Sequence, residues 1–354
     1  MMADPVKMPA REFYKLTTED KTEIWLTRFN GGPKGPVMLV HGVSVWSGMF
    51  TLPTISRNFV SYLVENSYDV WLLDWRASIQ LPLSQFTLDE VAKYDYPRAV
   101  KHIREITRKD SVQAVVHCVG SIAFFMSLAS GLLPDVRCVA CSQVALHPTV
   151  GTVVRCKAGM QLASLIADLG MNHISPVPDP NYPIFSAFLG AFVNSVHHEC
   201  SSTVCHRMTF MYGHIYPHAT LNVETHDQLN EQFGWCNIKT LQHLQQLVDR
   251  GGVAAKFDYG PKENKRRYGD SVPPTYLDDA SHLRIPITLV SGADNRCFLP
   301  QTTLRTYDWL SERNGPSLYT RHVVPGFGHW DNFVGAEAYK HCYPRYLEQL
   351  DKCP

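Results

Sequence analysis

The sequence predicts an α/β protein built on a mostly parallel, doubly wound sheet. Short, almost wholly apolar runs alternate with amphipathic stretches over much of the chain, as expected for strands that are covered on both faces. The 354 residues are 45% hydrophobic and 19% charged, which allows a large core and excludes disorder for most of the chain. Because 33 Lys and Arg balance 33 Asp and Glu and no basic stripe occurs, we expect no nucleic-acid partner.

Six apolar runs are expected to be buried strands: residues 37–40, 70–74, 114–116, 138–142, 287–290 and 322–324. Helices are expected at residues 54–65, 88–107 and 122–130, and Thr87 with Glu90 forms the pattern of a capping box. Residues 111–133 carry no formal charge and are long enough to span a bilayer. Their polar residues and glycines favour a buried strand, turn and helix, so we expect no stable membrane insertion.

The alternation of strand and helix stops between residues 151 and 279, where His, Asn, Tyr and Pro are frequent. We predict a core made of residues 1–150 and 280–354, with residues 151–279 inserted as a lid over the carboxyl edge of the sheet. A separate second domain is the alternative. The charged, Pro-rich stretch at residues 260–274 is expected to be a surface loop.

The run Ala114-Val-Val-His-Cys-Val-Gly-Ser121 is the strongest chemical signal. A strand leads into a tight turn and a helix leaves it, which is the arrangement that lifts a nucleophile above a sheet. Cys118 takes the nucleophile's place, and the start of the following helix favours a thiolate there. A buried cysteine that serves only as a small apolar residue is the alternative.

Three further segments supply the partners that such a cysteine needs. His41-Gly-Val-Ser44 follows the first strong strand, so that the N–H of Val43, together with that of Val119, forms an oxyanion hole. Asp294 follows a late strand and is predicted to orient a histidine. His329, in a Gly-rich loop after the last strand, is predicted to be that histidine and the base. The order nucleophile, acid, base is the one expected for this architecture.

With these motifs, the chain resembles the α/β-hydrolases, and in particular the module found beside the flavin domain of some bacterial cholesterol-oxidase-like proteins. The stretches that carry the resemblance reach from about residue 12 to about residue 350 and include LVHGVSVWSGMF, DVWLLDWRAS, HCVGSIAFFMSL, HHECSSTVCHRMTFMYG, SGADNRCF and PGFGHWDNFVG. The segments Asp74-Trp-Arg76 and Gly328-His-Trp-Asp331 are also similar to acid lipases. A cysteine in the nucleophile turn is similar to polyhydroxyalkanoate synthases and dienelactone hydrolases.

The resemblance implies an α/β-hydrolase fold with an inserted lid, a Cys-His-Asp triad and a small lipophilic, steroid-, polyketide- or lipid-like substrate. We expect hydrolysis of an ester, lactone or thioester through a thioester acyl-enzyme. An acyltransferase or cyclase that uses the same cysteine is the first alternative, and a non-catalytic ligand-binding protein is the second. The residues predicted to hold the catalytic residues in place, without touching the substrate, are His117, Asp331 and Arg76. The predicted substrate pocket comprises Ser44, Trp46, Phe210 and Met211.

The segment His197-His-Glu-Cys200 and the pair Cys205-His206 suggest a metal site. The C-x4-C spacing is long for a zinc knuckle and no matching second pair is evident, so we predict packed thiols or a disulfide there, with no metal and no cofactor. The N-terminus has no apolar core typical of a signal peptide and the cysteines are scattered, so a cytoplasmic location with reduced thiols is expected. The oligomeric state is left open.

Overall fold

A computed structural model describes residues 8–354, so the first seven residues of the predicted core lie outside the described residues. Its centre is an eight-stranded sheet in the order β1-β2-β4-β3-β5-β6-β9-β10, in which β2 runs antiparallel to both of its neighbours and all other pairs are parallel. The strands are β1 (Arg11–Thr17), β2 (Glu23–Asn30), β3 (Lys34–Val40), β4 (Tyr68–Asp74), β5 (Val112–His117), β6 (Val136–Ser142), β9 (Ile287–Gly292) and β10 (Tyr319–Val324).

All six predicted strands are confirmed, each longer than its apolar core. The hairpin of β1 and β2 was not predicted, because it lies at the sheet edge and mixes exposed with buried positions. The uncharged stretch at residues 111–133 is confirmed as a strand, turn and helix. No helix within residues 8–354 is both long enough and apolar enough to cross a bilayer.

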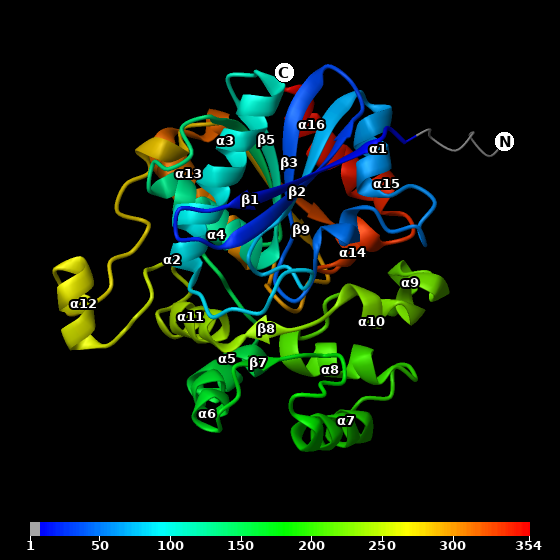
Figure 1. Ribbon diagram of the computed structural model, residues 1–354, viewed down its shortest axis with the longest axis vertical. Coiled ribbons are helices and arrows are strands. Elements are labelled where there is room, and N and C mark those ends of the chain that lie inside the picture. The colour runs from blue at the N-terminus through cyan, green and yellow to red at the C-terminus, as the bar shows by residue number, and fades with distance from the viewer. Residues whose placement is uncertain (1–7) are drawn as a thin grey trace.

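Helices cover both faces of the sheet (Figure 1). One face packs against α3, α4 and α13, and the other packs against α1 and α16. The helices of the core are α1 (Phe59–Glu65), α2 (Leu88–Glu90), α3 (Tyr96–Thr107), α4 (Cys118–Ala129), α13 (Gln301–Asn314), α14 (Asp331–Val334), α15 (Ala338–His341) and α16 (Tyr343–Asp351), with short helical turns at η1 (Ser47–Phe50), η4 (Ser281–Leu283) and η5 (Pro316–Leu318).

The helix predicted over residues 88–107 is present but is interrupted by a wider turn, η2 (Val91–Asp95). Its capping box is confirmed, with Thr87 and Glu90 each accepting from the other's backbone N–H. The helix predicted from residue 54 begins only at Phe59, where the Asn58 side chain accepts from the N–H of Ser61. The helix predicted from residue 122 begins earlier, at Cys118 itself.

Residues 151–279 contribute no strand to the main sheet and lie along one edge of it, below the sheet in Figure 1. They form a helical layer with a two-stranded ribbon of β7 (His173–Ile174) and β8 (Cys236–Asn237). The helices are α5 (Thr152–Gly159), α6 (Leu162–Asp168), α7 (Pro183–Val196), α8 (Thr203–Tyr212), α9 (Val223–Asp227), α10 (Leu229–Gln232), α11 (Ile238–Asp249) and α12 (Pro261–Tyr268), with the turn η3 (His218–Thr220). We refer to residues 151–279 as the lid segment.

The surface loop predicted at residues 260–274 is wrong in part, because residues 261–268 form α12. Pro261 occupies the first turn, where its missing N–H costs nothing, and Gly269 ends the helix in a left-handed conformation. Glu263 pairs with Arg266 and Arg267, one turn further along the helix. The basic residues therefore stabilise an exposed helix, which projects to the side of the molecule in Figure 1.

A buried ion pair fixes the loop after β4. Arg76, only 4% exposed, donates to Asp95, which is fully buried, and to Asp20 near the β1–β2 hairpin. Burial alone raises the pKa of Asp95, and the Arg76 charge opposes that effect. The pair therefore joins the strand end, the helical segment at residue 95 and the edge hairpin.

We predict that Arg76→Ala lowers the free energy of unfolding by about 3–5 kcal/mol, because it leaves Asp95 buried without its partner. Denaturant unfolding followed by circular dichroism measures the change. Arg266→Ala, which removes an exposed pair on α12, is the control and should leave the unfolding curve nearly unchanged. Equal stability of the two variants would contradict this role for Arg76.

Candidate active site at the carboxyl edge of the sheet

The turn between β5 and α4 holds Cys118 in a strained conformation. Its φ is +58°, a left-handed value that is uncommon for a residue with a side chain. The turn fits only because small residues surround it: a Cβ on Gly120 would lie 2.2 Å from the carbonyl oxygen of His41, and one on Gly42 would lie 3.1 Å from the Cys118 Sγ. The structure thus places Cys118 at a sharp strand-to-helix bend, as predicted.

Two backbone N–H groups point at the cysteine sulfur. The N–H groups of Val119, at the start of α4, and Val43, in the loop after β3, lie close enough to the sulfur to lower the pKa of its thiol. These are the two amides predicted for an oxyanion hole. Donors that converge on one point at a helix N-terminus can hold a negatively charged oxygen.

The loop that carries Val43 is braced from the core and from the lid segment. The Asp74 carboxylate accepts from the N–H of Ser47 at 2.9 Å and from its hydroxyl at 2.6 Å. On the other side, the Ser44 and Tyr212 hydroxyls are 2.6 Å apart, and the N–H of Gly234 donates to the Ser44 carbonyl. The position of the Val43 amide therefore depends on contacts from both parts of the chain.

His329 reaches the cysteine from the loop after β10. A ring nitrogen of His329, one of His117 and the Cys118 Sγ all lie within 4.8 Å of one another. The His329 Nε2 is buried and has no hydrogen-bond partner among residues 8–354. Its loop is held by the Ile215 carbonyl, which accepts from the N–H groups of His329 and Trp330 at 2.7 and 2.8 Å.

The residue behind the imidazole is Asn295 and not Asp294, which corrects the predicted triad. The Asn295 Nδ2 lies 3.1 Å from the His329 Nδ1, whereas the Asp294 side chain is exposed and makes no hydrogen bond to His329. The Asn295 Oδ1 already accepts from the N–H groups of Cys297 and Phe298. The turn after β9 directs successive side chains in different directions, and sequence spacing alone did not show which of the two faces inward.

This hydrogen-bond pattern fixes the tautomer of the imidazole. Since Oδ1 of Asn295 is used by two backbone donors, its Nδ2 donates to the His329 Nδ1. In a neutral ring the proton then sits on Nε2, the nitrogen on the side away from Asn295. An aspartate at this place would accept from Nδ1 and leave Nε2 free to act as a base.

Cys118, Val119, Val43 and His329 form one wall of a cavity with about 190 Å³ of accessible interior volume. The rest of the lining is mostly apolar and comes from both the sheet edge and the lid segment, including Leu162, Ile166, Leu244, Phe298 and Trp330. The cavity therefore suits an apolar molecule whose reactive group meets the sulfur.

Comparisons with known proteins agree with this arrangement. No family model matches the chain. The gastric triacylglycerol lipase of Rattus norvegicus is 24% identical over 371 residues, covering 97% of this chain and 88% of the lipase. The lysosomal acid lipase/cholesteryl ester hydrolase of Macaca fascicularis is 24% identical over 373 residues, covering 96% and 88%. A putative lipase from Sulfolobus solfataricus superposes with a TM-score of 0.60 at 15% identity, covering 97% and 94%. This chain has the α/β-hydrolase fold.

A second solved structure, an esterase from Thermogutta terrifontis, superposes on this α/β-hydrolase-fold chain with a TM-score of 0.56 at 13% identity, covering 97% of this chain and 99% of the esterase. These proteins are named as lipases and esterases. The more specific resemblance to the module beside the flavin domain of cholesterol-oxidase-like proteins therefore stays a prediction. The fold places the turn of Cys118, the loop of Val43 and the loop of His329 together at one edge of the sheet, in the order that was predicted.

The residues predicted to support the site are all buried, in different places. His117 packs its ring 4.8 Å from that of His329 and lies 3.1 Å from the Ser142 hydroxyl through Nδ1. The Asp331 carboxylate accepts from the N–H of Gly328 at 2.8 Å and so shapes the histidine loop. Arg76 contacts Asp20 and Asp95 and does not line the cavity.

Of the four predicted pocket residues, Met211 lines the cavity and the other three do not. Ser44 points to Tyr212, which itself lines the cavity, and Trp46 covers Gly48. The Phe210 ring lies under the Lys157 ammonium group, whose nitrogen is 4.2 Å from the ring centre. These corrections share one cause: adjacent residues of a turn or helix face in different directions, which the apolar pattern around them did not resolve.

Burial keeps the central pair uncharged. It raises the pKa of Cys118 to about 12, although the hydrogen bonds from Val119 and Val43 act in the opposite direction. Burial also lowers the pKa of His329 to about 3. At neutral pH the structure therefore holds a neutral thiol beside a neutral imidazole, and not a thiolate–imidazolium pair.

We predict that alkylation of Cys118 by iodoacetamide accelerates about tenfold per pH unit between about pH 6 and pH 9, because only the thiolate reacts and its fraction rises with pH below a high pKa. Peptide mass spectrometry measures the rate, and exposed Cys156 in the same sample monitors the reagent. A rate that levels off within this range would indicate a preformed ion pair and contradict the neutral resting state.

Proposed function

We propose that this chain is an enzyme that acts on an ester, lactone or thioester carbonyl of a bulky lipophilic molecule, with Cys118 as nucleophile. One observation carries the proposal: the Cys118 sulfur receives two backbone N–H groups and lies beside a buried imidazole at the wall of an apolar cavity. The curated relatives are named for triacylglycerol and cholesteryl esters, which supports an ester of a large apolar group as the substrate class.

In the proposed reaction, the sulfur attacks the carbonyl carbon and a carbon–sulfur bond forms. The carbonyl oxygen becomes an oxyanion that the Val43 and Val119 amides stabilise, and loss of one such donor typically raises a barrier by about 3 kcal/mol. The thiol proton passes to His329 and then to the departing alkoxide or thiolate. This leaves a thioester on Cys118 and releases the alcohol or thiol. Water then attacks the thioester, the acid leaves, and the thiol is restored.

The proton transfer requires His329 to expose a lone pair on Nε2. In the resting arrangement Nε2 carries the proton, because Asn295 donates to Nδ1. A half-turn of the Asn295 amide would present Oδ1 to Nδ1 and switch the tautomer. It would also give up the bonds that Oδ1 accepts from Cys297 and Phe298 and the bond that Nδ2 donates to the Gln143 Oε1, at a net cost of about 1 kcal/mol each. The proposed reaction therefore requires the Asn295 amide to turn before His329 can take the thiol proton.

Deacylation need not use water. A thioester accepts alcohol and carbon nucleophiles readily, and the apolar cavity favours a nucleophile that belongs to the substrate over free water. Acyl transfer, lactone formation or a Claisen-type ring closure through the same cysteine is therefore the alternative outcome. Partition of a labelled acyl group between free acid and an acceptor separates these outcomes from hydrolysis.

A second candidate function is ligand binding without catalysis. Two observations favour it: the buried neutral thiol and the asparagine that holds His329 in the tautomer that cannot take a proton at Nε2. A binding protein needs the cavity but no acyl-enzyme, so the detection of a covalent intermediate decides between the two functions.

We predict that incubation with activated esters of medium-length and steroid-like acids adds the mass of one acyl group to the wild-type chain. Intact-mass and peptide analysis should place it on Cys118, since that sulfur alone meets both oxyanion donors. Cys118→Ala should show no adduct, while Cys297→Ala, which alters another cavity cysteine, should still form it. If Cys118→Ala keeps full turnover, the proposed mechanism is wrong. If the wild type binds the ester without acylation or turnover, ligand binding is favoured.

We predict that Asn295→Asp accelerates acylation of Cys118 by about tenfold or more, because a carboxylate accepts from the His329 Nδ1 and makes Nε2 a base. The single-turnover rate with an activated ester measures it. Asp294→Asn is the matched control and should leave the rate unchanged, because that side chain faces solvent. The reverse pattern would restore Asp294 as the acid.

A further inference from the structure

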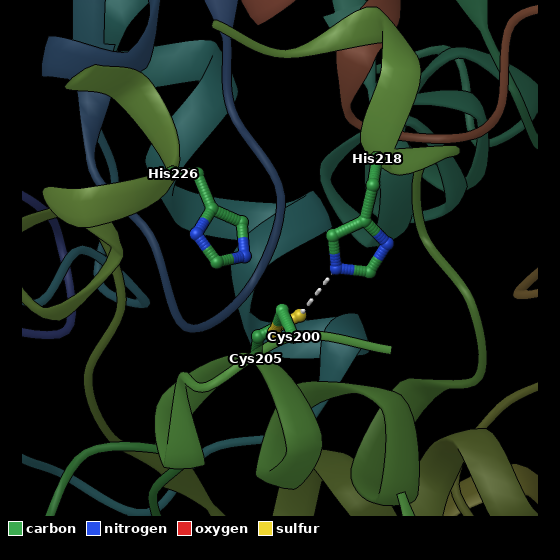
Figure 2. Close-up of side chains that lie close together, drawn as sticks. All are labelled: Cys200, Cys205, His218 and His226. Atoms are coloured by element: carbon green, nitrogen blue, oxygen red, sulfur yellow. Dashed lines mark hydrogen bonds between the residues drawn. The ribbon is translucent and has the colours of Figure 1, made fainter. Parts of the chain in front are cut away.

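A second cluster of reactive side chains lies in the lid segment, apart from the cavity. Cys200, in the connection between α7 and α8, and Cys205, in the first turn of α8, lie opposite His218 of η3 and His226 of α9. One potential ligand atom of each residue, sulfur or ring nitrogen, lies within 4.8 Å of those of the other three. Figure 2 shows the two imidazoles directed toward the two cysteines from separate elements.

The polar surroundings of the cluster suit sulfur that carries a negative charge. The Tyr216 hydroxyl donates to the Cys205 Sγ at 3.1 Å, and the backbone N–H of Ser202 donates to the Cys200 Sγ at 3.4 Å. The His218 Nε2 lies 3.4 Å from the Cys205 Sγ. Both sulfurs are free thiols and do not form the disulfide that was one of the sequence expectations.

The fourth member supplies an unused donor atom. The His226 Nε2 is buried and has no hydrogen-bond partner among the described residues, a costly state for a ring nitrogen. On the other side of the ring, Nδ1 lies 4.0 Å from the Asp227 carboxylate, on the side where metal-binding histidines commonly have an orienting group. A ligand in the centre of the cluster would satisfy Nε2.

The donor set selects the kind of ion. Two thiols and two imidazoles without any carboxylate match the tetrahedral S₂N₂ set of zinc and exclude the oxygen-rich shells of Ca²⁺ and Mg²⁺. Zinc bonds of about 2.3 Å to sulfur and 2.1 Å to nitrogen require ligand atoms about 3.3–3.8 Å apart. Because the ligand atoms lie within 4.8 Å of one another, the cluster needs to contract by at most about 1.0–1.4 Å at its widest separation.

We propose that Cys200, Cys205, His218 and His226 bind one zinc ion. The sequence pair C-x4-C lacked a matching second pair, and the fold supplies it from residues 13 and 21 positions beyond Cys205. Four protein ligands complete a tetrahedral shell, so the ion is structural and binds no substrate. Zinc binding would remove the two thiol protons and connect the α7–α8 connection to η3 and α9.

The zinc site lies next to the segment that holds the loop of His329 in place. Between Cys205 and His218 lies Ile215, whose carbonyl holds the backbone of His329 and Trp330. The next residue, Tyr216, donates to the Cys205 sulfur and packs its ring 6.1 Å from that of Trp330. The ion would thus stabilise the segment that positions the histidine loop. The inference depends on the cluster alone and holds whether or not Cys118 is catalytic.

The full-length chain, produced with zinc in the medium and purified without chelator, provides the test. Elemental analysis by mass spectrometry should find about one zinc per chain, as a closed structural site requires. Replacement by Co²⁺ should give the visible bands of a tetrahedral cobalt–thiolate centre, which is a readout independent of any variant. Removal with a strong chelator should lower the melting temperature and expose two thiols to a thiol reagent.

Variants assign the ligands. Cys205→Ser and His226→Gln should each abolish the cobalt–thiolate spectrum of a four-ligand site, whereas Cys156→Ser, which alters an exposed cysteine on α5, should keep it. His206→Gln should also keep it, because His206, although its Nε2 lies 3.7 Å from the Cys200 Sγ, is not in the group whose ligand atoms all lie within 4.8 Å of one another. Wild-type protein without bound zinc or cobalt, or with a Cys200–Cys205 disulfide, would overturn the proposal. Retention of the metal in Cys205→Ser would do the same.

Discussion

The left-handed backbone at Cys118 is the constraint on which the site depends. Such a conformation costs a residue with a side chain about 1–3 kcal/mol, so the surrounding structure must stabilise it. Here the enforcement comes from close packing: the carbonyl of His41 approaches Gly120, and Gly42 approaches the sulfur itself. The same bend points the sulfur away from the buried strand β5 and directs the N–H of Val119 toward it. The strain at Cys118 and the position of the Val119 amide beside its sulfur are therefore consequences of one turn.

The lid segment lines part of the cavity and also holds the loops around it. It holds both loops that face Cys118: Tyr212 and Gly234 contact the oxyanion loop, and Ile215 fixes the backbone of the histidine loop. A movement of α8 and the following residues would therefore change the geometry around the sulfur as well as access to it. The proposed zinc site lies within this same segment. Zinc there would affect the stability of the lid segment, whereas the proposed reaction takes place at the edge of the sheet.

Much of the fold and part of the site could be predicted from the sequence. Strands such as β4 and β5 are buried along their whole length and contain runs of consecutive apolar residues, from which parallel strands can be predicted. The strands β1 and β2 were missed because exposed and partly exposed positions are mixed with buried ones along both. Cys118, Val43 and His329 were found because each belongs to a turn with its own local signature. Asn295 was not, because the choice between it and Asp294 depends on which way a turn directs two adjacent side chains.

The cluster in the lid segment illustrates the same limit over a longer range. Cys200 and Cys205 are close in sequence, but His218 and His226 reach them only through the path of the chain across η3 and α9. No spacing rule connects the four positions. Arg76 was likewise predicted as a supporting residue without its partners, because Asp95 and Asp20 are distant in sequence and Asp20 lies on the hairpin that was not predicted.

The central claim is that the Cys118 sulfur and two backbone amides form one reaction centre. A crystal structure of the chain with an alkyl trifluoromethyl ketone, which forms a stable tetrahedral adduct with a reactive thiol, tests it most directly. We expect a bond from the Cys118 sulfur to the ketone carbon, the adduct oxygen within hydrogen-bond distance of the Val43 and Val119 nitrogens, and the alkyl chain in the apolar cavity. An adduct on another residue, or an inhibitor bound in the cavity with its carbonyl turned away from both amides, would contradict it.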